Sequence, residues 1–592
     1  MTTTNAVVRD VDDHHHLYDC LVVGGGISGS TLAHNLHRSH GVDVLLCESS
    51  DRLGGNVCTS TVALSEDDDD NDDGGASFFL YEEGPSNFET SPCVMRISDE
   101  LDLSNEIVLA SENRSLSTWI YHDDGRIHPL PDGKRIFGRG GILDFVLRDD
   151  LLSWRGKLRA FAGLFLGHPP PPTPPNDDDD AVEESIMDWS IRTLGAEAYR
   201  TIIEPIVSGI YVGDPSRLSA RTTLPKLMRM EGRAYELGWN VRGALLYGGL
   251  AMRRDAAAGS GEGMPSSSSS SPTEEEEERR NDEAEDRHHH HHHPPPRGYD
   301  DYHGRPGSYK TGLIALPNAI MDELGPSRVR LSWRLTNVER GANNDDDDGG
   351  GGYYVATFDN DGTHRKVKAR TLVVTIPTYA IGTSLDVVLP GSADLFGRGK
   401  SDDAKISGGV SYPPVASVTV AYPKSAFRDV DLADGSGNLR DLPGFGMVST
   451  RSAGLRILAT LFSSSLFPGR CPVEYNLLSC TIGGARDEAV GAMSEDDLVA
   501  VVDGDLRTML LRPEAPHPKV LGLKIWPRAI PQYELGHSDT MTELKRMEDT
   551  NDAGGLWVCG NYRTGVSLTA CINFGYDHAK VVAGHLSSKR RG

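Results

Sequence analysis

Short apolar runs alternate with helical patterns at both ends of the chain, whereas the middle is mixed. Continuous apolar and β-branched runs predict buried strands, and apolar residues three and four apart predict helices. The predicted strands are Cys20 to Val23, Val42 to Cys47, Val329 to Leu331, Leu372 to Ile376, Val415 to Ala421 and Leu556 to Cys559. The predicted helices are Ile27 to Arg38, Ile186 to Leu194, Ala198 to Ile203, Leu316 to Leu324 and Thr569 to Ala583. We therefore expect one α/β domain assembled from distant segments, with other domains inserted into it.

Four low-complexity inserts interrupt this pattern, at residues 65–75, 169–180, 255–296 and 341–352. The first and last are acidic and glycine-rich, and strand and turn patterns flank them, so we expect enlarged hairpin tips. The second joins a proline run to an aspartate run, which predicts a stiff, solvated loop. The longest insert, residues 255–296, has too few apolar residues to offset the conformational entropy that it would lose on ordering, so we expect it to be disordered.

The longest insert contains six consecutive histidines, His288 to His293. Clustered imidazoles bind divalent metals, but nothing beside this run supplies the ordered groups that hold metal ligands in place. We interpret it as a disordered tract and predict no physiological metal site in the chain.

The composition changes this picture in two ways. The 592 residues include 59 Lys and Arg against 86 Asp and Glu, a net charge of −27, which excludes a generic nucleic-acid binder. The four inserts hold 26 acidic and 3 basic residues, so the rest of the chain carries a net charge of only −4. No apolar stretch is long enough to predict a membrane-spanning helix, and the eight cysteines show no CxxC pair, which favours a reducing compartment.

A glycine motif follows the first predicted strand. Residues 19–29 read DCLVVGGGISG, so Gly24, Gly26 and Gly29 have the GxGxxG spacing directly before a helical pattern that opens with Ile27 and Ser28. The first glycine permits a tight turn, the second admits a pyrophosphate, and the third lets helix and strand pack closely. Glu48 ends the next strand, 19 residues after Gly29, where an acid is expected to bind ribose. Together these residues predict an FAD or NAD site.

Two further segments decide between the two cofactors. The sequence SSDRLGGNV contains Arg52, Gly54, Gly55 and Asn56, and it resembles the RxGG element of the FAD-dependent amine oxidase superfamily. The segment GLWVCGNYRTGVSLTACINFGYDHA resembles the closing segment of the same superfamily. The resemblance implies one FAD per chain, bound non-covalently. The cofactor residues that it adds are Gly84 and Pro85 in EEGPSNF, Leu335 in a middle strand, and Gly560, Asn561, Val566, Ser567 and Leu568.

The middle of the chain resembles one family within that superfamily. The blocks LGAEAYRTIIEPIVSGIYVGDPSRLSA, SYPPVASVTVAYPKSAFRD, GFGMVSTRSAGLRILATLFSSSLFPGRCP, WPRAIPQYELGH and GLIALPNAIMDELG are similar to oxygen-dependent protoporphyrinogen oxidases of the plastid and bacterial type. This resemblance implies oxidation of protoporphyrinogen IX to protoporphyrin IX in three two-electron steps, with oxygen as acceptor and hydrogen peroxide as by-product. It also implies no metal and no catalytic side-chain acid or base.

The same resemblance implies the substrate contacts. Phe445 matches an aromatic residue that stacks on a pyrrole ring, Val415 an aliphatic residue that packs on the macrocycle, and Gly213 and Asp214 a loop close to the pyrrole nitrogens. The family arginine that pairs with a propionate is displaced here: Leu116 stands at the expected position, and Arg114 is the best candidate for that contact. Taken without the family, the aromatic and aliphatic residues would be interpreted as core and the loop as a turn.

We predict a three-part organisation, with the inserts set apart. Residues 17–96, 309–378 and 553–590 form the FAD-binding domain. Residues 97–250 form a mainly helical, membrane-associated domain with part of the substrate site, and residues 379–552 form a mixed-sheet substrate domain.

The predicted partners are protoporphyrinogen IX, oxygen and a membrane surface, which is contacted through Trp154 to Leu166, a segment that combines cations with an apolar run. A homodimer and hand-over of the product to chelatases are further expectations. The resemblance favours a plastid membrane, with the mitochondrial inner membrane as the alternative, although no targeting peptide is evident.

Two other functions remain open at this level. The same FAD fold acts on other substrates, such as amines or carotenoid precursors, because a fold does not determine a substrate. A non-catalytic tetrapyrrole or flavin carrier would also retain the fold, and the displaced arginine is its only support.

Overall fold

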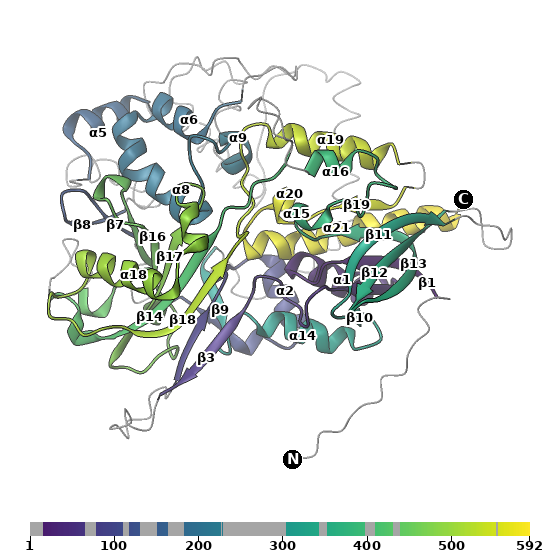
Figure 1. The fold of residues 1–592 in the computed structure, drawn as a ribbon, viewed down its shortest axis with the longest axis horizontal. Helices are drawn as coiled ribbons and strands as arrows, with labels where there is room; N and C mark the ends of the chain where they lie inside the picture. Colours follow the sequence, from purple (N-terminus) through teal and green to yellow (C-terminus); the bar gives the residue numbers. More distant parts are fainter. Residues whose placement is uncertain are drawn as a thin grey trace, which may run out of the picture.

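The computed structural model describes residues 16–64, 78–110, 118–130, 151–163, 183–225, 228, 304–341, 352–396, 409–429, 439–551 and 554–591. Two seven-stranded sheets with helices packed against them make up most of these residues (Figure 1). Arg114 and the inserts, apart from Gly341 and Gly352, lie outside the described residues.

The first sheet has a parallel centre. Its order is β10-β2-β1-β13-β12-β11, and β19 also pairs with β13. Its strands are β1 (Leu17–Val23), β2 (Val44–Cys47), β10 (Val329–Arg330), β11 (Arg334–Gly341), β12 (Tyr353–Asn360), β13 (Thr363–Val374) and β19 (Leu556–Val558). Strands β10, β2, β1, β13 and β19 run parallel, whereas β12 is antiparallel to both its neighbours. The strands predicted near the two chain ends are confirmed as β1, β2 and β19, and the predicted α/β class is confirmed as well.

Helices cover both faces of this sheet, which explains why β2 and the C-terminal ends of β1 and β13 are buried on both faces. One face carries α1 (Ile27–His40), α2 (Pro92–Glu100), α14 (Ala315–Leu324) and α21 (Leu568–Arg591). The other carries α15 (Thr378–Ile381), α16 (Ser392–Phe396), α19 (His537–Asp549) and α20 (Asn561–Thr564).

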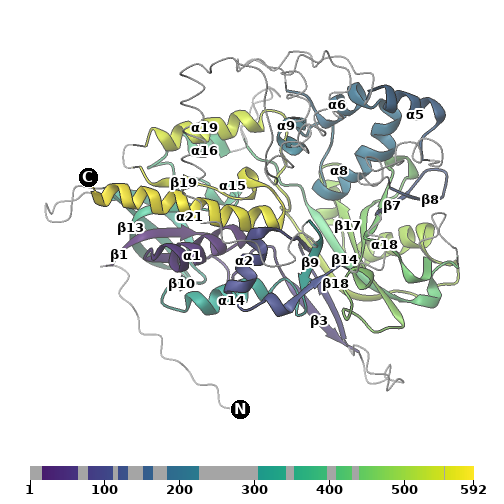
Figure 2. The same cartoon turned by 180° about the vertical axis from the view of Figure 1, so that it is seen from behind.

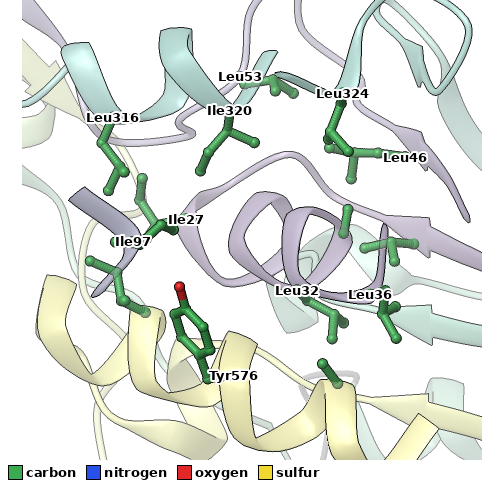
Figure 3. Packing of buried hydrophobic residues seen from close by; sticks show 14 of the residues in the cluster. Ile27, Leu32, Leu36, Leu46, Leu53, Ile97, Leu316, Ile320, Leu324 and Tyr576 are labelled. Atoms are coloured by element: carbon green, nitrogen blue, oxygen red, sulfur yellow. The ribbon is translucent and has the colours of Figure 1, made fainter. Parts of the chain in front are cut away.

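Helix α1 is the centre of the first layer. Figure 3 shows it between α14, which contributes Leu316 and Ile320, and α21, which contributes Tyr576. The contact between α1 and α21 is close, because a Cβ atom on Gly575 would stand 2.6 Å from Cγ2 of Thr31. The view from behind shows α21 lying along α1 (Figure 2).

The second sheet is antiparallel except at one pair. Its order is β18-β14-β17-β16-β15-β7-β8. Its strands are β18 (Lys519–Trp526), β14 (Val415–Pro423), β17 (Tyr475–Gly483), β16 (Ile457–Phe462), β15 (Gly446–Ser449), β7 (Thr118–Tyr121) and β8 (Ile127–Pro129). Only β15 and β7 are parallel. Helix α18 (Glu495–Met509) covers the face that carries Ala416, Val418 and Val420. Because strand residues alternate between faces, Val415 and Ser417 lie on the other face.

Strands β7 and β8 come from residues that the sequence assigned to a mainly helical domain. They pair with β15 and extend the second sheet, so the helical part proper begins later. It comprises α5 (Trp154–Phe161), α6 (Ile186–Thr193), α7 (Ala196–Ala198), a π-helical turn at Tyr199–Ile203, α8 (Glu204–Tyr211) and α9 (Ala220–Thr223). These elements lie beyond one end of the second sheet (Figures 1 and 2). The two helices predicted here are confirmed, the second as a π-helical turn.

Small elements complete the described chain. β3 (Thr59–Ala63) and β4 (Phe78–Glu82) form an antiparallel pair, and β5 (Phe88–Glu89), β9 (Pro306–Tyr309) and β6 (Ile107–Leu109) form a three-stranded sheet. The remaining helical turns are α17 (Ser463–Leu466) and 3-10 turns at Ser104–Glu106, Lys424–Ala426, Leu439–Asp441, Arg451–Ala453 and Glu488–Ala492. The inserts at 65–75 and 341–352 each join two strands that pair antiparallel, in agreement with the expectation of hairpin tips.

A buried ion pair joins the β3–β4 pair to the segment that leads from α17 into β17 of the second sheet. Nη2 of Arg470, which follows α17, lies 3.2 Å from Oε1 of Glu82 in β4, and the two side chains are 5% and 2% exposed. Thr59 Oγ1 donates to Oε2 of Glu82 at 2.6 Å, and the Leu313 N–H donates to Oε1 at 3.0 Å. Arg470 also donates to Ser308 Oγ at 2.5 Å. Burial raises the pKa of Glu82 and lowers that of Arg470, and the charge of each partner opposes these shifts.

We predict that Arg470→Met lowers the free energy of unfolding by about 3–5 kcal/mol, because it leaves the buried Glu82 carboxylate without a positive charge beside it. The double variant Glu82→Gln/Arg470→Met should recover part of this loss, since both charges are then gone. Urea unfolding followed by tryptophan fluorescence measures both effects. Arg38→Met is the control: it breaks the exposed pair of Arg38 with Glu323 and should cost less than about 1 kcal/mol. Equal losses for Arg470→Met and Arg38→Met would contradict the prediction.

Candidate functional site

The glycine motif forms an open cradle between β1 and α1. Gly24 has a φ of +108°, which favours glycine, and a Cβ atom on Gly29 would collide with the Gly24 carbonyl oxygen. A Cβ atom on Gly26 would meet nothing within 4 Å. Gly26 is also the N-cap of α1, and no side chain caps the helix there. Free space in front of uncapped N–H groups, at the positive end of the helix dipole, fits a pyrophosphate.

The RxGG segment packs directly against this cradle. Gly26 and Gly54 form a parallel bridge, and the Gly54 N–H donates to the Gly25 carbonyl at 2.8 Å. A Cβ atom on Gly55 would lie 3.2 Å from Cα of Gly26. Arg52 donates to the carbonyls of Leu53, Gly55 and Val57 at 2.8–3.1 Å, so its guanidinium shapes the turn that presents the two glycines. Its predicted phosphate contact stays a prediction.

Glu48 lies at the end of β2 with its carboxylate oriented by the neighbouring backbone. The Gly25 N–H donates to Oε2 at 2.6 Å, and the N–H and Oγ of Ser50 both donate to Oε1 at 2.8 Å. The Glu48 carbonyl accepts from the Trp333 N–H at 2.8 Å, two residues before Leu335. This hydrogen bond brings the residues just before β11 next to Glu48, and Leu335 in β11 is largely buried. Ser49 Oγ also donates to Oε1, at 3.1 Å, so Oε2 is the oxygen with room for a ribose hydroxyl.

The C-terminal block lies beside the glycine cradle. Leu568, at the start of α21, shares a buried cluster with Ile27 and Leu53. Ser28 hydrogen-bonds the thiol of Cys571, and burial raises the pKa of that thiol. The N-termini of α1 and α21 are thus adjacent, which adds a second positive helix end to the site.

The remaining residues predicted to bind the cofactor border the same region. Gly560 has a φ of +148° and is the N-cap of α20, and its neighbour Asn561 accepts a hydrogen bond from Tyr533 Oη through its carbonyl. Ser567 Oγ accepts from the Ala570 N–H at 3.1 Å, and Val566 is half-buried beside it. A Cβ atom on Gly84, which precedes the half-buried Pro85, would collide with the carbonyl oxygen of the exposed Asn56. The structure therefore brings four separate segments to one place.

The loop of Gly213 and Asp214, which is predicted to lie close to the pyrrole nitrogens, lies at one end of the second sheet. A Cβ atom on Gly213 would collide with Oε1 of Gln532, so the loop backbone runs close to its neighbours. Asp214 accepts from Arg486 Nη2 at 2.8 Å and from Ser216 Oγ at 2.7 Å. Burial alone would raise the pKa of Asp214, but these hydrogen bonds hold it at about 2. Asp214 is therefore ionised and held by Arg486 and Ser216.

Val415 belongs to this end of the sheet. It is buried against Val212 and Ala529, and it pairs with Gly483 on one side and Trp526 on the other. Next to it is a cavity of about 330 Å³, at the lower end of the range for ligand pockets. Its walls include Ser208, Val212, Gly213, Leu458, Gly483 and Arg486.

Phe445 lies at the other end of the same sheet. It packs with Val108, Ala110 and Phe467, and its carbonyl accepts from the Phe462 N–H at 3.1 Å. Phe462 is level with Val420 in the strand register, five residues along β14 from Val415. Phe445 and Val415 are therefore separated by roughly 15 Å along the strands, and they share no contact cluster. A ligand that touches both must span the sheet.

Several residues of the site escaped prediction from the sequence. Arg486 joins Glu204 at 2.6 Å to Asp214, and Arg470 joins Glu82 across 388 residues of chain. No local spacing signals such pairs. Both arginines lie within or beside sequence blocks that resemble the family. Such a block indicates the region of the site but does not identify the residue with which an arginine pairs.

The whole chain resembles known flavoproteins. The family model described as flavin containing amine oxidoreductase matches residues 27–583, and the chain belongs to this family. The cofactor is FAD. Among named relatives, protoporphyrinogen oxidase, chloroplastic, of Oryza sativa subsp. japonica is 34% identical over 571 residues, which cover 96% of this chain and 89% of the relative. The protein of the same name from Nicotiana tabacum is 32% identical, over 96% of this chain and 86% of that relative.

A solved structure supports the fold. A protein assigned provisionally as a protoporphyrinogen oxidase, from Exiguobacterium sp. 255-15, aligns with a TM-score of 0.62 at 20% identity. The alignment covers 96% of this chain and 99% of that one. At 20% identity this similarity is evidence for the fold only.

The glycine cradle yields a paired prediction. Gly26 has ordinary helix-entry angles and open space around it, so Gly26→Val should leave the apoprotein folded but fill the space for the pyrophosphate. Gly29→Val should instead destabilise the fold, because its Cβ atom meets backbone. We expect Gly26→Val to bind FAD at least about 10-fold more weakly, measured by flavin absorbance and fluorescence titration of the apoprotein, with an unchanged circular dichroism spectrum. Full retention of FAD by Gly26→Val would overturn this placement of the cofactor.

Proposed function

We propose that this protein is a protoporphyrinogen oxidase, which converts protoporphyrinogen IX to protoporphyrin IX. The observation that carries the proposal is the 34% identity to the Oryza sativa relative over 96% of the chain, with the glycine cradle also present. When bound, FAD supplies two-electron oxidation and is regenerated by oxygen. Three cycles remove six electrons and six protons from the substrate and reduce three oxygen molecules to hydrogen peroxide.

The residues of the chain itself bind the cofactor and the substrate, orient them and exclude water from them. The cradle at Gly26 and Gly54 holds the pyrophosphate, and Glu48 holds the ribose, which together fix the cofactor. Phe445, Val415 and the backbone at Gly213 are the proposed walls for the macrocycle, and Asp214 orients that backbone through Arg486. A flat apolar ligand between such walls is positioned mainly by packing and exclusion of water. Arg114 remains our proposed partner of a propionate.

The test is a flavin assay on the purified holoprotein. Without oxygen, protoporphyrinogen IX should bleach the flavin absorbance, and air should restore it with release of peroxide and porphyrin fluorescence. Phe445→Ala should raise KM by about 10-fold while the FAD content is unchanged, because it removes a wall and not a cofactor contact. The absence of flavin reduction by protoporphyrinogen would overturn the proposal. Faster turnover of an amine or a carotenoid precursor would show that the enzyme acts on that compound and not on protoporphyrinogen IX.

We also propose that the protein binds a membrane surface, in a plastid, through helix α5. The relatives named above are chloroplastic proteins, which supports the compartment. On α5, Trp154 and Leu158 are 65% and 69% exposed and Phe161 is also exposed, at a spacing that places all three on one side of the helix. Arg155, next to Trp154, is also exposed and places a cation beside the apolar stripe, whereas Lys157 is buried.

Such a stripe fits the interface of a bilayer, where aromatic and aliphatic side chains insert and cations meet lipid phosphates. In the described part of the chain, no helix has the length and apolar character needed to cross a bilayer.

Trp154→Ser/Leu158→Gln should reduce binding to anionic lipid vesicles by about 10-fold or more, because it removes the two most exposed apolar side chains of α5. Co-sedimentation with vesicles measures the effect. Val473→Ser is the control, because Val473 is 63% exposed but lies outside the α5 stripe. Equal binding by the double variant and the control would exclude α5 as the membrane contact.

A further inference from the structure

The hairpin formed by β7 and β8 carries a cluster of two histidines and an aspartate. His122 follows β7, His128 lies in β8, and Asp124 stands in the turn between them. The possible ligand atoms of the three side chains all lie within 4.8 Å of one another, the only such group of three in the described part of the chain. Nothing in the oxidase function uses these residues.

The hairpin geometry explains why they meet. Ile120 is paired with His128, and His122 is two residues beyond Ile120, so both imidazoles project from the same face of the hairpin. Their ring centroids are 5.8 Å apart, edge to face. The His122 N–H donates to the Arg126 carbonyl at 3.0 Å, which closes the turn. The Arg126 N–H donates to Oδ1 of Asp124 at 2.8 Å, and this bond turns the carboxylate back over the strands.

The distances suit a tetrahedral metal ion. Oδ1 of Asp124 lies 3.6 Å from Nδ1 of His122, and Oδ2 lies 3.0 Å from Nε2 of His128. Metal–ligand bonds of about 2.0–2.2 Å at a tetrahedral angle place neighbouring ligand atoms about 3.4 Å apart. The two observed distances lie on either side of this value, and because they end on different oxygens of Asp124, a shared ion requires the carboxylate to turn or to bind through both oxygens. His122 and Asp124 are partly exposed, at 23% and 40%, so their side chains are free to adjust.

The charges suit a dication. Asp123 lies 2.6 Å from the same His122 Nδ1 and adds a second carboxylate to the cluster. Two neutral imidazoles and two carboxylates together balance a charge of +2. Two nitrogen ligands and a carboxylate oxygen are a ligand set that Zn²⁺ accepts, with water in the remaining position.

We propose that His122, Asp124 and His128 bind a divalent transition metal, Zn²⁺ in the first place, as a clip on the edge of the second sheet. This revises the expectation from the sequence, which considered only the histidine run as a metal ligand. The clip ties the turn to β8, the outermost strand, and β7 pairs with β15 directly after Phe445. Its role is to stiffen this edge, and no electron of the oxidase reaction passes through it.

The test must separate this site from the histidine run. The full-length holoprotein with His288 to His293 all changed to serine is the parent, and Co²⁺ is the probe. Tetrahedral Co²⁺ gives strong d–d absorption at wavelengths beyond the flavin bands. We expect the parent to show this absorption with one equivalent of Co²⁺, and Zn²⁺ to abolish it by displacement. His128→Gln and Asp124→Asn should each weaken binding on the order of 100-fold.

The control variant is His364→Gln, which changes an exposed histidine in the β12–β13 hairpin and should bind like the parent. Zn²⁺ should also raise the thermal midpoint of the parent and of the control, but not that of the two site variants. Flavin content and circular dichroism, unchanged across the set, identify variants that are folded. Absence of the tetrahedral absorption in the parent, or equal binding by the folded Asp124→Asn variant, would overturn the proposal. The failure of oxidase activity would not affect this result, because the readout is the metal itself.

Discussion

The buried ion pair between Glu82 of β4 and Arg470 fastens the β3–β4 pair, beside the cofactor cradle, to the segment between α17 and β17. Both groups are almost fully removed from water, so each is acceptable only in the presence of the other. Glu82 is held from the cofactor side by Thr59 and Leu313. The guanidinium of Arg470 also lies 4.8 Å from the centre of the Phe467 ring, which packs in the same cluster as Phe445. A single buried charge pair therefore joins the strands beside the cofactor cradle to the proposed aromatic wall.

Much of the first sheet could be predicted because its signal is local. Strand β2, the last residues of β1 and β13, and β19 are runs of three or four mainly apolar residues, and such a run is visible without knowledge of the partner strands. The GxGxxG segment was predictable for the same reason, since Gly24 and Gly29 meet each other within six residues.

The second sheet and its proposed site were less accessible to prediction. The hairpin of β7 and β8 joins β15 across more than 300 residues, and nothing near Thr118 indicates this pairing. Arg486 acts on Asp214 across 272 residues, so its role depends on the completed fold. Phe445 and Val415 were predicted from family blocks as contacts of one ligand, whereas their separation along the sheet follows from strand register, which the sequence does not state.

The adjacency of α1 and α21 has a consequence for biosynthesis. Strand β1 and the glycine turn leave the ribosome early, but the helix that completes the cradle starts at Leu568, 545 residues after Val23. Strand β13, the central partner of β1, also follows only after 340 residues, from Val23 to Thr363. Throughout that interval β1 presents an unpaired apolar edge, the kind of surface that chaperones shield and that aggregates when left bare. The complete FAD cradle therefore forms only after α21 has been synthesised. Until β13 is available, the apolar edge of β1 has to be protected from aggregation.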